Sequence, residues 1–204
     1  MTRPSDMPVS VRKFVLLFDI CSSTTILEDL IRTENQGAWQ AVLTELKRFM
    51  WQLREKVAPF EMYKFLGDGW ILLFEDEAVT GAQLIDIASH LCAEYDRLFR
   101  THVATVLSVM PKHVGVTFGA DEGSLVQIVM NEQEEYVGRA INVAARLQAA
   151  VKQQEGAPPG TFLITKNAFA RLHLKHQTEL VQCNLANVTG GDAYQVHKLR
   201  VQGG

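Results

Sequence analysis

Long apolar runs are missing from this chain: none reaches the roughly 18 consecutive residues that a membrane-spanning helix needs. The N-terminal segment MTRPSDMPVS also lacks the apolar stretch of a secretory signal peptide. Cysteine is scarce, with three residues at wide spacing (Cys21, Cys92 and Cys183) and no CxxC pair. An odd and scattered set argues against a disulfide framework or a zinc site and favours reduced thiols. We therefore expect a cytoplasmic protein without membrane contact.

An excess of positive charge is also absent, because 20 Lys and Arg residues are outnumbered by 23 Asp and Glu residues and the net charge is −3. Such a chain offers no basic field for a nucleic-acid backbone, so we expect no nucleic-acid partner. Six prolines and 14 glycines are too few for a fibrous or low-complexity chain, and 47% hydrophobic residues exclude disorder. The length predicts a single domain over residues 1–204.

Apolar periodicity predicts strands and helices in the order β-α-α-β-β-α-β-β-α-β-α-β-β. The expected strands are 11–19, 61–66, 70–74, 114–118, 125–130, 161–165 and two within 179–201, around Gly190-Gly191. The first expected helix begins after Ser22 or Ser23 as N-cap. Further helices are expected over residues 34–57, 81–102, 139–153 and 167–172. A turn is expected at 121–123. Because the early strands adjoin through a hairpin, we expect an α+β fold with a largely antiparallel sheet and helices on one side.

Two aspartates lie where predicted strands end or turn. Asp19 ends an apolar run, where an unpaired carboxylate is costly to bury, and Asp68 lies at the tip of the predicted hairpin Gly67-Asp68-Gly69. Each alone is typical of a cap or turn residue. If the hairpin lies beside the first strand, the two carboxylates become neighbours that repel each other unless a cation lies between them. Hard oxygen ligands favour magnesium or manganese bridging a triphosphate.

Polar residues at regular spacing mark two further predicted elements. Asn142 and Arg146 are four residues apart and share one helix face. Such a pair is typical of a solvated face, but an amide can also fix a ribose and a guanidinium can offset charge growing on a phosphate. Lys64 is expected on the strand face opposite to Tyr63 and Phe65, which we place in the core. An ordinary exposed strand lysine is the alternative for Lys64.

Three segments in this order resemble the class III nucleotidyl cyclase catalytic domain. Residues 18–24 (FDICSST) resemble the first metal segment of that family, and residues 64–69 (KFLGDG) resemble its Lys-x-x-Gly-Asp hairpin. Residues 138–146 (GRAINVAAR) resemble its Gly-x-x-Val-Asn-x-Ala-x-Arg helix. The resemblance covers about residues 11–196. It implies a ferredoxin-like core that forms a head-to-tail homodimer, with active sites at the interface.

The resemblance also implies a role for each motif residue. Asp19, Ile20 and Asp68 of one protomer would bind two divalent metal ions, Mn²⁺ or Mg²⁺. Asn142 and Arg146 of the other protomer would orient the ribose and stabilise the phosphorane-like transition state. The ribose 3′-hydroxyl of a nucleoside triphosphate would attack its own α-phosphate and release pyrophosphate.

One family position is occupied differently in this chain. Thr189 and Gly191 stand in the tail segment where the family commonly has a phosphate-binding lysine. Lys166, Lys198 or an arginine is left for that role.

Base selection is expected from Lys64 and Glu135, which match the positions that read the base in adenylate cyclases of this family. An amine and a carboxylate can pair with adenine, cytosine or uracil. Glu135 is one methylene longer than the usual aspartate and Tyr136 beside it is bulky, so a crowded pocket favours a smaller base.

A small cyclase with such a pocket and no attached sensor is similar to the bacterial pyrimidine cyclases of Pycsar anti-phage systems. This implies conversion of UTP to cyclic UMP, which activates a separate effector. Cytidylate and adenylate cyclase activities are the alternatives, followed by an inactive nucleotide-sensing module.

Overall fold

The computed structural model describes residues 7–154, 159–188 and 194–201. In this part of the chain, eight strands join in one sheet of order β2-β3-β1-β4-β6-β8-β7, and β5 pairs with β4 outside that row. Neighbouring strands are antiparallel except β4 and β6, which are parallel. The predicted α+β class with a mostly antiparallel sheet is confirmed.

The element order differs from the prediction at one place, because the two expected strands 114–118 and 125–130 form the single strand β4, and β5 is a strand that the sequence analysis did not predict. The strands are β1 (Val9–Ile20), β2 (Glu61–Phe65), β3 (Gly69–Glu75), β4 (Val116–Met130), β5 (Gln133–Val137), β6 (Thr161–Thr165), β7 (Glu179–Cys183) and β8 (Tyr194–Arg200). The helices are α1 (Ser23–Arg32), α2 (Gln36–Lys56), α3 (Gly81–Leu98), α4 (Arg139–Ala150) and α5 (Lys166–Arg171). A π-helical turn (Phe99–Val103) follows α3, and a 3₁₀ turn (Val151–Gln153) follows α4. No helix within these described ranges is long and apolar enough to cross a membrane.

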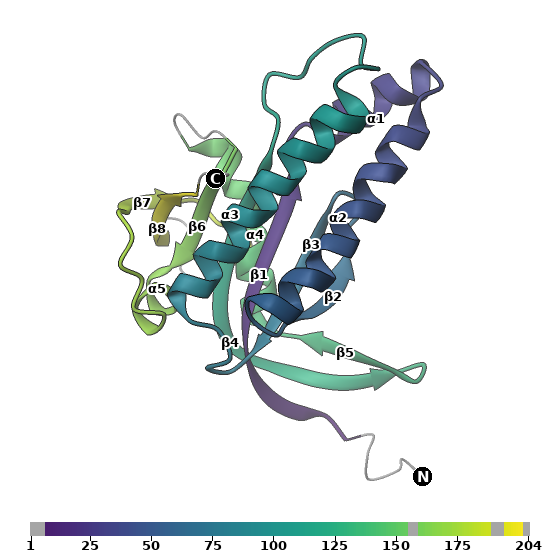
Figure 1. Cartoon of the computed structure of the whole chain (residues 1–204). Coiled ribbons are helices and arrows are strands. Elements are labelled where there is room, and N and C mark those ends of the chain that lie inside the picture. Colours follow the sequence, from purple (N-terminus) through teal and green to yellow (C-terminus); the bar gives the residue numbers. More distant parts are fainter. Residues whose placement is uncertain (1–6, 155–158, 189–193, 202–204) are drawn as a thin grey trace.

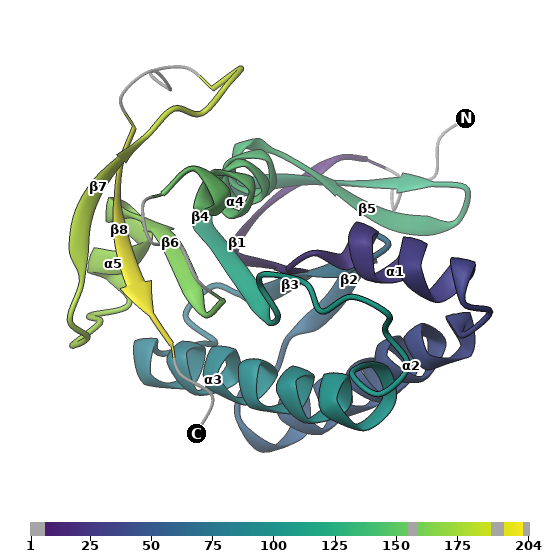
Figure 2. The same cartoon turned by 90° about the horizontal axis from the view of Figure 1, so that it is seen from above.

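Strand β1 lies between β3 and β4 and is covered by helices on both sides (Figures 1 and 2). Its even-numbered residues, such as Phe14 and Phe18, belong to the core cluster that includes α1, α2 and α3. Val15 and Leu17 belong to a second cluster that includes α4. The expectation of helices on one side is therefore wrong. A continuous apolar run is typical of a strand that is buried on both faces.

Strand β4 continues through residues 121–123, where the sequence predicts a turn. Asp121 pairs with Val15 of β1 and is buried, and its carboxylate accepts a hydrogen bond from Thr165 Oγ1 at 2.6 Å. Because this partner replaces water, the polar residue can stay inside the sheet. The chain turns instead at residues 131–132, both with positive φ, and β5 returns along β4 as a hairpin arm (Figure 1).

Helix α1 begins with Ser22 as the N-cap residue, as the sequence predicts, but without a side-chain cap. Ser22 occupies the N-cap position with φ 58°, and its hydroxyl donates to the His113 carbonyl oxygen at 3.0 Å instead of capping the helix. The Ser23 hydroxyl donates to the Asp68 carboxylate. Neither serine is therefore a side-chain cap. The predicted turn at Gly190-Gly191 lies outside the described residues.

Helix α4 lies close to β4 because small residues meet where they cross. A Cβ atom added at Gly119 of β4 would lie 2.2 Å from the Ala144 carbonyl oxygen and 2.4 Å from the Gln148 backbone nitrogen. No side chain fits at this position without moving the helix. The contact therefore fixes the position of α4 relative to the central strands.

We expect Gly119→Ala to lower the free energy of unfolding by about 1–3 kcal/mol, because overpacking displaces α4 from β4. Gly37→Ala is the matched control, since a Cβ there meets nothing within 4 Å on α2. Removing a helical glycine raises stability by about 0.5–1 kcal/mol. Urea unfolding of both variants measures the two values. Equal effects would contradict the close contact at Gly119.

Candidate active site

The end of β1 and the turn between β2 and β3 bring Asp19 and Asp68 together. Asp19 pairs with Gly69 in the sheet register, and the Ile20 amide donates to the Asp68 carbonyl oxygen at 3.2 Å. Gly69 permits this approach, because a Cβ there would lie 2.1 Å from the Phe18 carbonyl oxygen. The Asp19 and Asp68 carboxyl groups lie within hydrogen-bonding reach of each other. The predicted hairpin therefore lies beside the first strand.

Burial and the neighbouring carboxylate disfavour a negative charge on Asp19. Burial contributes most, followed by the hydrogen bond and the charge of Asp68, and together they raise the pKa of Asp19 to about 7. Lys152 and Gln148 act in the opposite direction. A divalent cation between the carboxylates would remove this penalty.

The donor set suits a hard cation. Two carboxylates match the oxygen ligands that Mg²⁺ and Mn²⁺ prefer. The Ile20 side chain is buried and apolar, so only its backbone carbonyl could be a further ligand. Within residues 7–154, 159–188 and 194–201, no group of three or more His, Cys, Asp and Glu residues converges on a metal site. The residues therefore fit a site that substrate completes.

Helix α4 brings two residues to Asp19 that the sequence analysis did not single out. Gln148 Nε2 donates to Asp19 Oδ2 at 3.2 Å and to Thr117 Oγ1 at 3.0 Å. Lys152 Nζ lies 4.0 Å from the same Asp19 oxygen. Gln148 follows Ala144 by four residues and is a buried residue of α4, and Lys152 follows Gln148 by four residues in the 3₁₀ turn, where its side chain is exposed. That spacing is the signal by which they could have been found.

Asn142 and Arg146 lie on a different face of α4. A shift of two residues turns a helix by about 200°, so both point away from the stripe that meets Asp19. Arg146 Nε donates to the Ala186 carbonyl oxygen at 2.5 Å, and its Nη1 donates to the Asn142 carbonyl oxygen at 3.1 Å. Asn142 is exposed and borders a hollow of about 340 Å³. Among the described residues, neither has a hydrogen bond or ion pair with Asp19 or Asp68.

Lys64 and Glu135 form an ion pair between β2 and β5, with 2.7 Å between Nζ and Oε2. The Tyr63 hydroxyl donates to the same Oε2 at 2.6 Å. The hydrogen bonds from Lys64 and Tyr63 lower the pKa of Glu135. The sequence placed Lys64 and Tyr63 on opposite faces, which is wrong because a β-bulge interrupts β2 between Met62 and Lys64.

The two aromatic neighbours of this pair differ in their surroundings. Tyr136 is 7% exposed and its side chain packs in the second core cluster, with Lys13 Nζ 5.1 Å from the ring centroid. Phe65 is 52% exposed and lies outside the core, contrary to the expectation. The polar groups of Lys64, Glu135 and Tyr63 are therefore bordered by one buried and one exposed ring.

The candidate phosphate-binding lysines lie around β8. Lys166 Nζ donates to Gln195 Oε1, and Lys198 Nζ lies 3.4 Å from Glu179 Oε2. Thr189 and Gly191 lie outside the described residues. Lys152 is the lysine that approaches Asp19.

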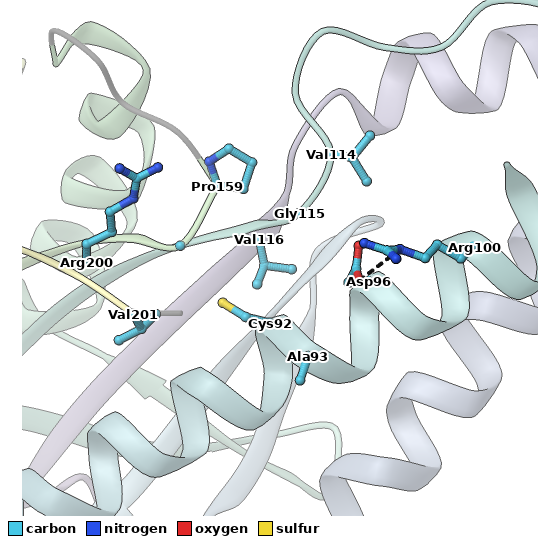
Figure 3. Close-up of a pocket in the computed structure, with 11 residues that line it drawn as sticks. Cys92, Ala93, Asp96, Arg100, Val114, Gly115, Val116, Pro159, Arg200 and Val201 are labelled. Carbon is cyan, nitrogen blue, oxygen red and sulfur yellow. Dashed lines mark hydrogen bonds and ion pairs between the residues drawn. The ribbon is translucent and has the colours of Figure 1, made fainter. Parts of the chain in front are cut away.

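A separate hollow of about 540 Å³ lies between α3, β4 and the end of β8 (Figure 3). Cys92 and the ion pair of Asp96 with Arg100 reach it from the α3 side. Its lining includes none of the predicted site residues. The Gly115 carbonyl oxygen at its edge accepts a hydrogen bond from the Cys21 amide at 2.8 Å, so the hollow lies behind the segment that carries Asp19.

Solved structures of nucleotide cyclases share this fold. A bacterial light-regulated adenylyl cyclase superposes with a TM-score of 0.69 over 96% of this chain and 54% of its own, at 20% identity. For the adenylyl cyclase CyaB from P. aeruginosa the TM-score is 0.70, with 94% and 95% covered at 18% identity. For the guanylyl cyclase Cya2 it is 0.68, with 96% and 94% covered at 15% identity.

The chain thus spans about half the length of the light-regulated cyclase and nearly all of the other two domains. No known family model matches the sequence, and neither does any curated protein. The predicted class III cyclase fold is confirmed by the structural likeness.

We expect Asp19→Asn to raise the melting temperature in metal-free buffer at pH 8. The carboxyl pKa is raised from 3.8 to about 7 in the folded state, so stability falls as the pH rises from about 4 through 7. The variant has no ionisable group at this position and does not lose this stability at high pH. Its melting temperature should therefore differ less from that of the wild type at pH 5 than at pH 8. Millimolar MnCl₂ should stabilise the wild type and leave the variant unchanged. Thermal denaturation at both pH values measures this.

Asp29→Asn is the control, because this substitution should change the melting temperature at pH 8 in the opposite direction. Hydrogen bonds from the Ser108 hydroxyl and amide lower the pKa of Asp29 to about 2, so its contribution is present above pH 4 and is lost as the pH falls toward 2. This variant should melt below the wild type at pH 8 and keep the response to MnCl₂. Mn²⁺ stabilisation of Asp19→Asn equal to that of the wild type would exclude Asp19 as a ligand.

Proposed function

We propose that this protein is a nucleotide cyclase that converts UTP to 3′,5′-cyclic UMP and pyrophosphate. The observation that carries the proposal is the carboxylate pair of Asp19 and Asp68, placed at adjacent strand ends in a fold shared with adenylyl and guanylyl cyclases. The raised pKa of Asp19 supports a site that is completed by cations. The whole chain, residues 1–204 with a core of about 11–196, is proposed as one cyclase domain.

In the proposed reaction, Asp19, Asp68 and the Ile20 carbonyl would hold two Mg²⁺ or Mn²⁺ ions. Bound metal supplies Lewis acidity that lowers the pKa of the 3′-hydroxyl and neutralises phosphate charge. The 3′-oxygen forms a bond to the α-phosphorus, the bond from that phosphorus to the bridging oxygen breaks, and pyrophosphate leaves. The hydroxyl proton passes to solvent.

Lys152 is proposed to bind the triphosphate from the same side as the metal carboxylates. Its ammonium group is exposed and lies 4.0 Å from Asp19 Oδ2, so it can offset charge on the phosphates beside the metals. Lys166 and Lys198 have their contacts around β8 instead. This assigns to Lys152 the role that the sequence left between several cations.

A homodimer is proposed because one chain separates the residues that the reaction needs. Asn142, which would orient the ribose, and Arg146, which would stabilise the transition state, point away from Asp19 in their own chain. A second copy arranged head to tail would supply them. The β4–β5 arm supports such an interface, because it exposes 40–50% of each of four apolar residues: Val126, Val129, Met130 and Val137.

The preference for UTP is proposed from the pair of Lys64 and Glu135. The lysine is a donor and the ionised carboxylate is an acceptor, as uracil O4 and N3–H require. Lys64 Nζ lies 2.7 Å from Glu135 Oε2, the Tyr63 hydroxyl donates to the same oxygen, and the Tyr136 ring packs in the neighbouring core cluster, so little room is left between the two charged groups. A small base fits such a site better than a purine. Cytidylate and adenylate cyclase activities stay the alternatives, because cytosine and adenine also present one donor and one acceptor side by side, with the two positions exchanged.

The product would act as a second messenger on a separate effector in anti-phage defence, as the resemblance to pyrimidine cyclases implies. Neither nucleic acid nor membrane is part of this proposal. The cytoplasm is the proposed compartment, consistent with three free cysteines.

The proposal predicts cyclic UMP as the dominant product when purified protein is incubated with ATP, GTP, CTP and UTP separately and with MnCl₂. Mass spectrometry identifies the product, and Asp68→Ala is the inactive control. Dominant cyclic AMP or cyclic CMP would replace the uridylate assignment. Binding of nucleotide without any cyclic product would favour the sensing module.

The shared site predicts complementation between two inactive variants. Asp68→Ala lacks a metal ligand and Asn142→Ala lacks the ribose contact, so each alone should lose at least about 100-fold in kcat. A mixed dimer contains one intact site, so an equimolar mixture should recover up to about a quarter of wild-type activity. No recovery, in the presence of heterodimers detected by native mass spectrometry, would place the whole site within one chain.

A further inference from the structure

Strand β2 contains one extra residue where it faces β3. Met62 pairs with Leu72 and Lys64 pairs with Ile71, so Tyr63 has no partner of its own in the register. In a regular strand, Tyr63 and Lys64 would point to opposite faces. The bulge turns both side chains toward Glu135 on β5.

The Tyr63 hydroxyl is held by the backbone of β5 and not only by Glu135. It accepts a hydrogen bond from the Tyr136 amide at 2.8 Å, and the Tyr136 carbonyl oxygen lies 3.1 Å away. The two tyrosine rings pack edge to face, with centroids 5.3 Å apart. The oxygen position is therefore set by packing and by the backbone. The fixed Tyr63 hydroxyl therefore determines the orientation of the Glu135 carboxylate.

Both hydrogen bonds to Glu135 go to one carboxylate oxygen. Lys64 Nζ lies 2.7 Å and the Tyr63 hydroxyl 2.6 Å from Oε2. Oε1 has no hydrogen-bond partner among the residues that the structure describes. Because Oε2 is occupied by these two hydrogen bonds, Oε1 is the oxygen that can accept a hydrogen bond from a base. It lies beside the remaining N–H donors of Lys64.

Glutamate needs such a restraint more than aspartate does. Its extra methylene adds a rotatable bond, and a freely rotating carboxylate could follow base edges of different shape. A fixed acceptor rejects a base whose donor is misplaced, because buried polar groups are then left unpaired.

We propose that Tyr63 is the positioning residue that sets base selectivity, by fixing the direction of the Glu135 acceptor next to Lys64. The inference rests on the proposed nucleotide cyclase function and deepens it. Tyr63 touches neither the metal carboxylates nor Asn142 or Arg146 in the described contacts. Its loss should therefore affect discrimination between bases and not the chemistry.

The test is Tyr63→Phe, which removes the hydroxyl and keeps the ring. We expect the ratio of kcat/KM for the preferred nucleoside triphosphate over the other three to fall about tenfold or more, as loss of a hydrogen bond to a charged group does. KM for the preferred substrate should rise, while kcat changes less than about threefold. Tyr95→Phe is the matched control, because its hydroxyl is buried without a partner in the described structure and lies on the opposite side of the sheet.

Binding provides a readout that does not depend on turnover. Calorimetry with the 3′-deoxy forms of UTP, CTP, ATP and GTP, in the presence of MnCl₂, gives the four dissociation constants for wild type and variant. The proposal predicts that the ratio between the weakest and the tightest of these dissociation constants falls in Tyr63→Phe by about the same factor as the kcat/KM ratio. Circular dichroism and the melting temperature show whether the variant is folded, and Tyr63→His, which keeps a ring with polar atoms, provides a second variant if it is not.

Two outcomes separate this inference from the proposed function. If wild-type protein forms no cyclic nucleotide from any substrate, the proposed function fails, and the calorimetric spread still tests Tyr63. If the wild type is an active and selective cyclase and the kcat/KM ratios between substrates in Tyr63→Phe stay within twofold of the wild-type ratios, the proposed role of Tyr63 is wrong. An equal loss of kcat for all four substrates would also overturn it, because it would indicate a merely structural contribution.

Discussion

Helix α4 can lie against the sheet only because Gly119 has no side chain where the Ala144 carbonyl oxygen arrives. This contact fixes both the height and the rotation of the helix over β1 and β4. With the rotation fixed, Gln148 of α4 donates to Asp19, and Lys152 of the 3₁₀ turn that follows the helix approaches the same carboxylate. The position of the candidate metal site thus depends on a steric contact one turn away from it.

The same rotation separates the polar residues of α4 into two groups. Residues facing the sheet meet the carboxylates of their own chain, and Asn142 and Arg146 face outward. If the chain is the cyclase that we propose, each copy holds two incomplete halves of the site, and a dimer would complete them. The pKa of Asp19, raised by burial, indicates that the metal half is also incomplete without cations.

Most of the fold and the approach of Asp19 to Asp68 could be predicted because their signals are local. Apolar periodicity marks each helix, and glycines on both sides of Asp68 mark the hairpin that carries it beside β1. The β4–β5 arm could not be predicted in the same way. Asp121 stays in its strand because of Thr165, which is 44 residues away in the sequence, so its segment resembles a turn until the tertiary contact is known.

Base recognition shows a second limit of sequence patterns. Lys64 and Glu135 can be identified by position, but their donor and acceptor polarity admits uracil, cytosine and adenine alike. Selectivity must then arise from how firmly the two groups are held. A β-bulge that aims Tyr63 at Glu135 is set by the register between β2 and β3, and no local residue pattern encodes it. In the selectivity that we propose, this one extra strand residue restricts the Glu135 carboxylate, so that the donor and acceptor pair of Lys64 and Glu135 favours one base over the others.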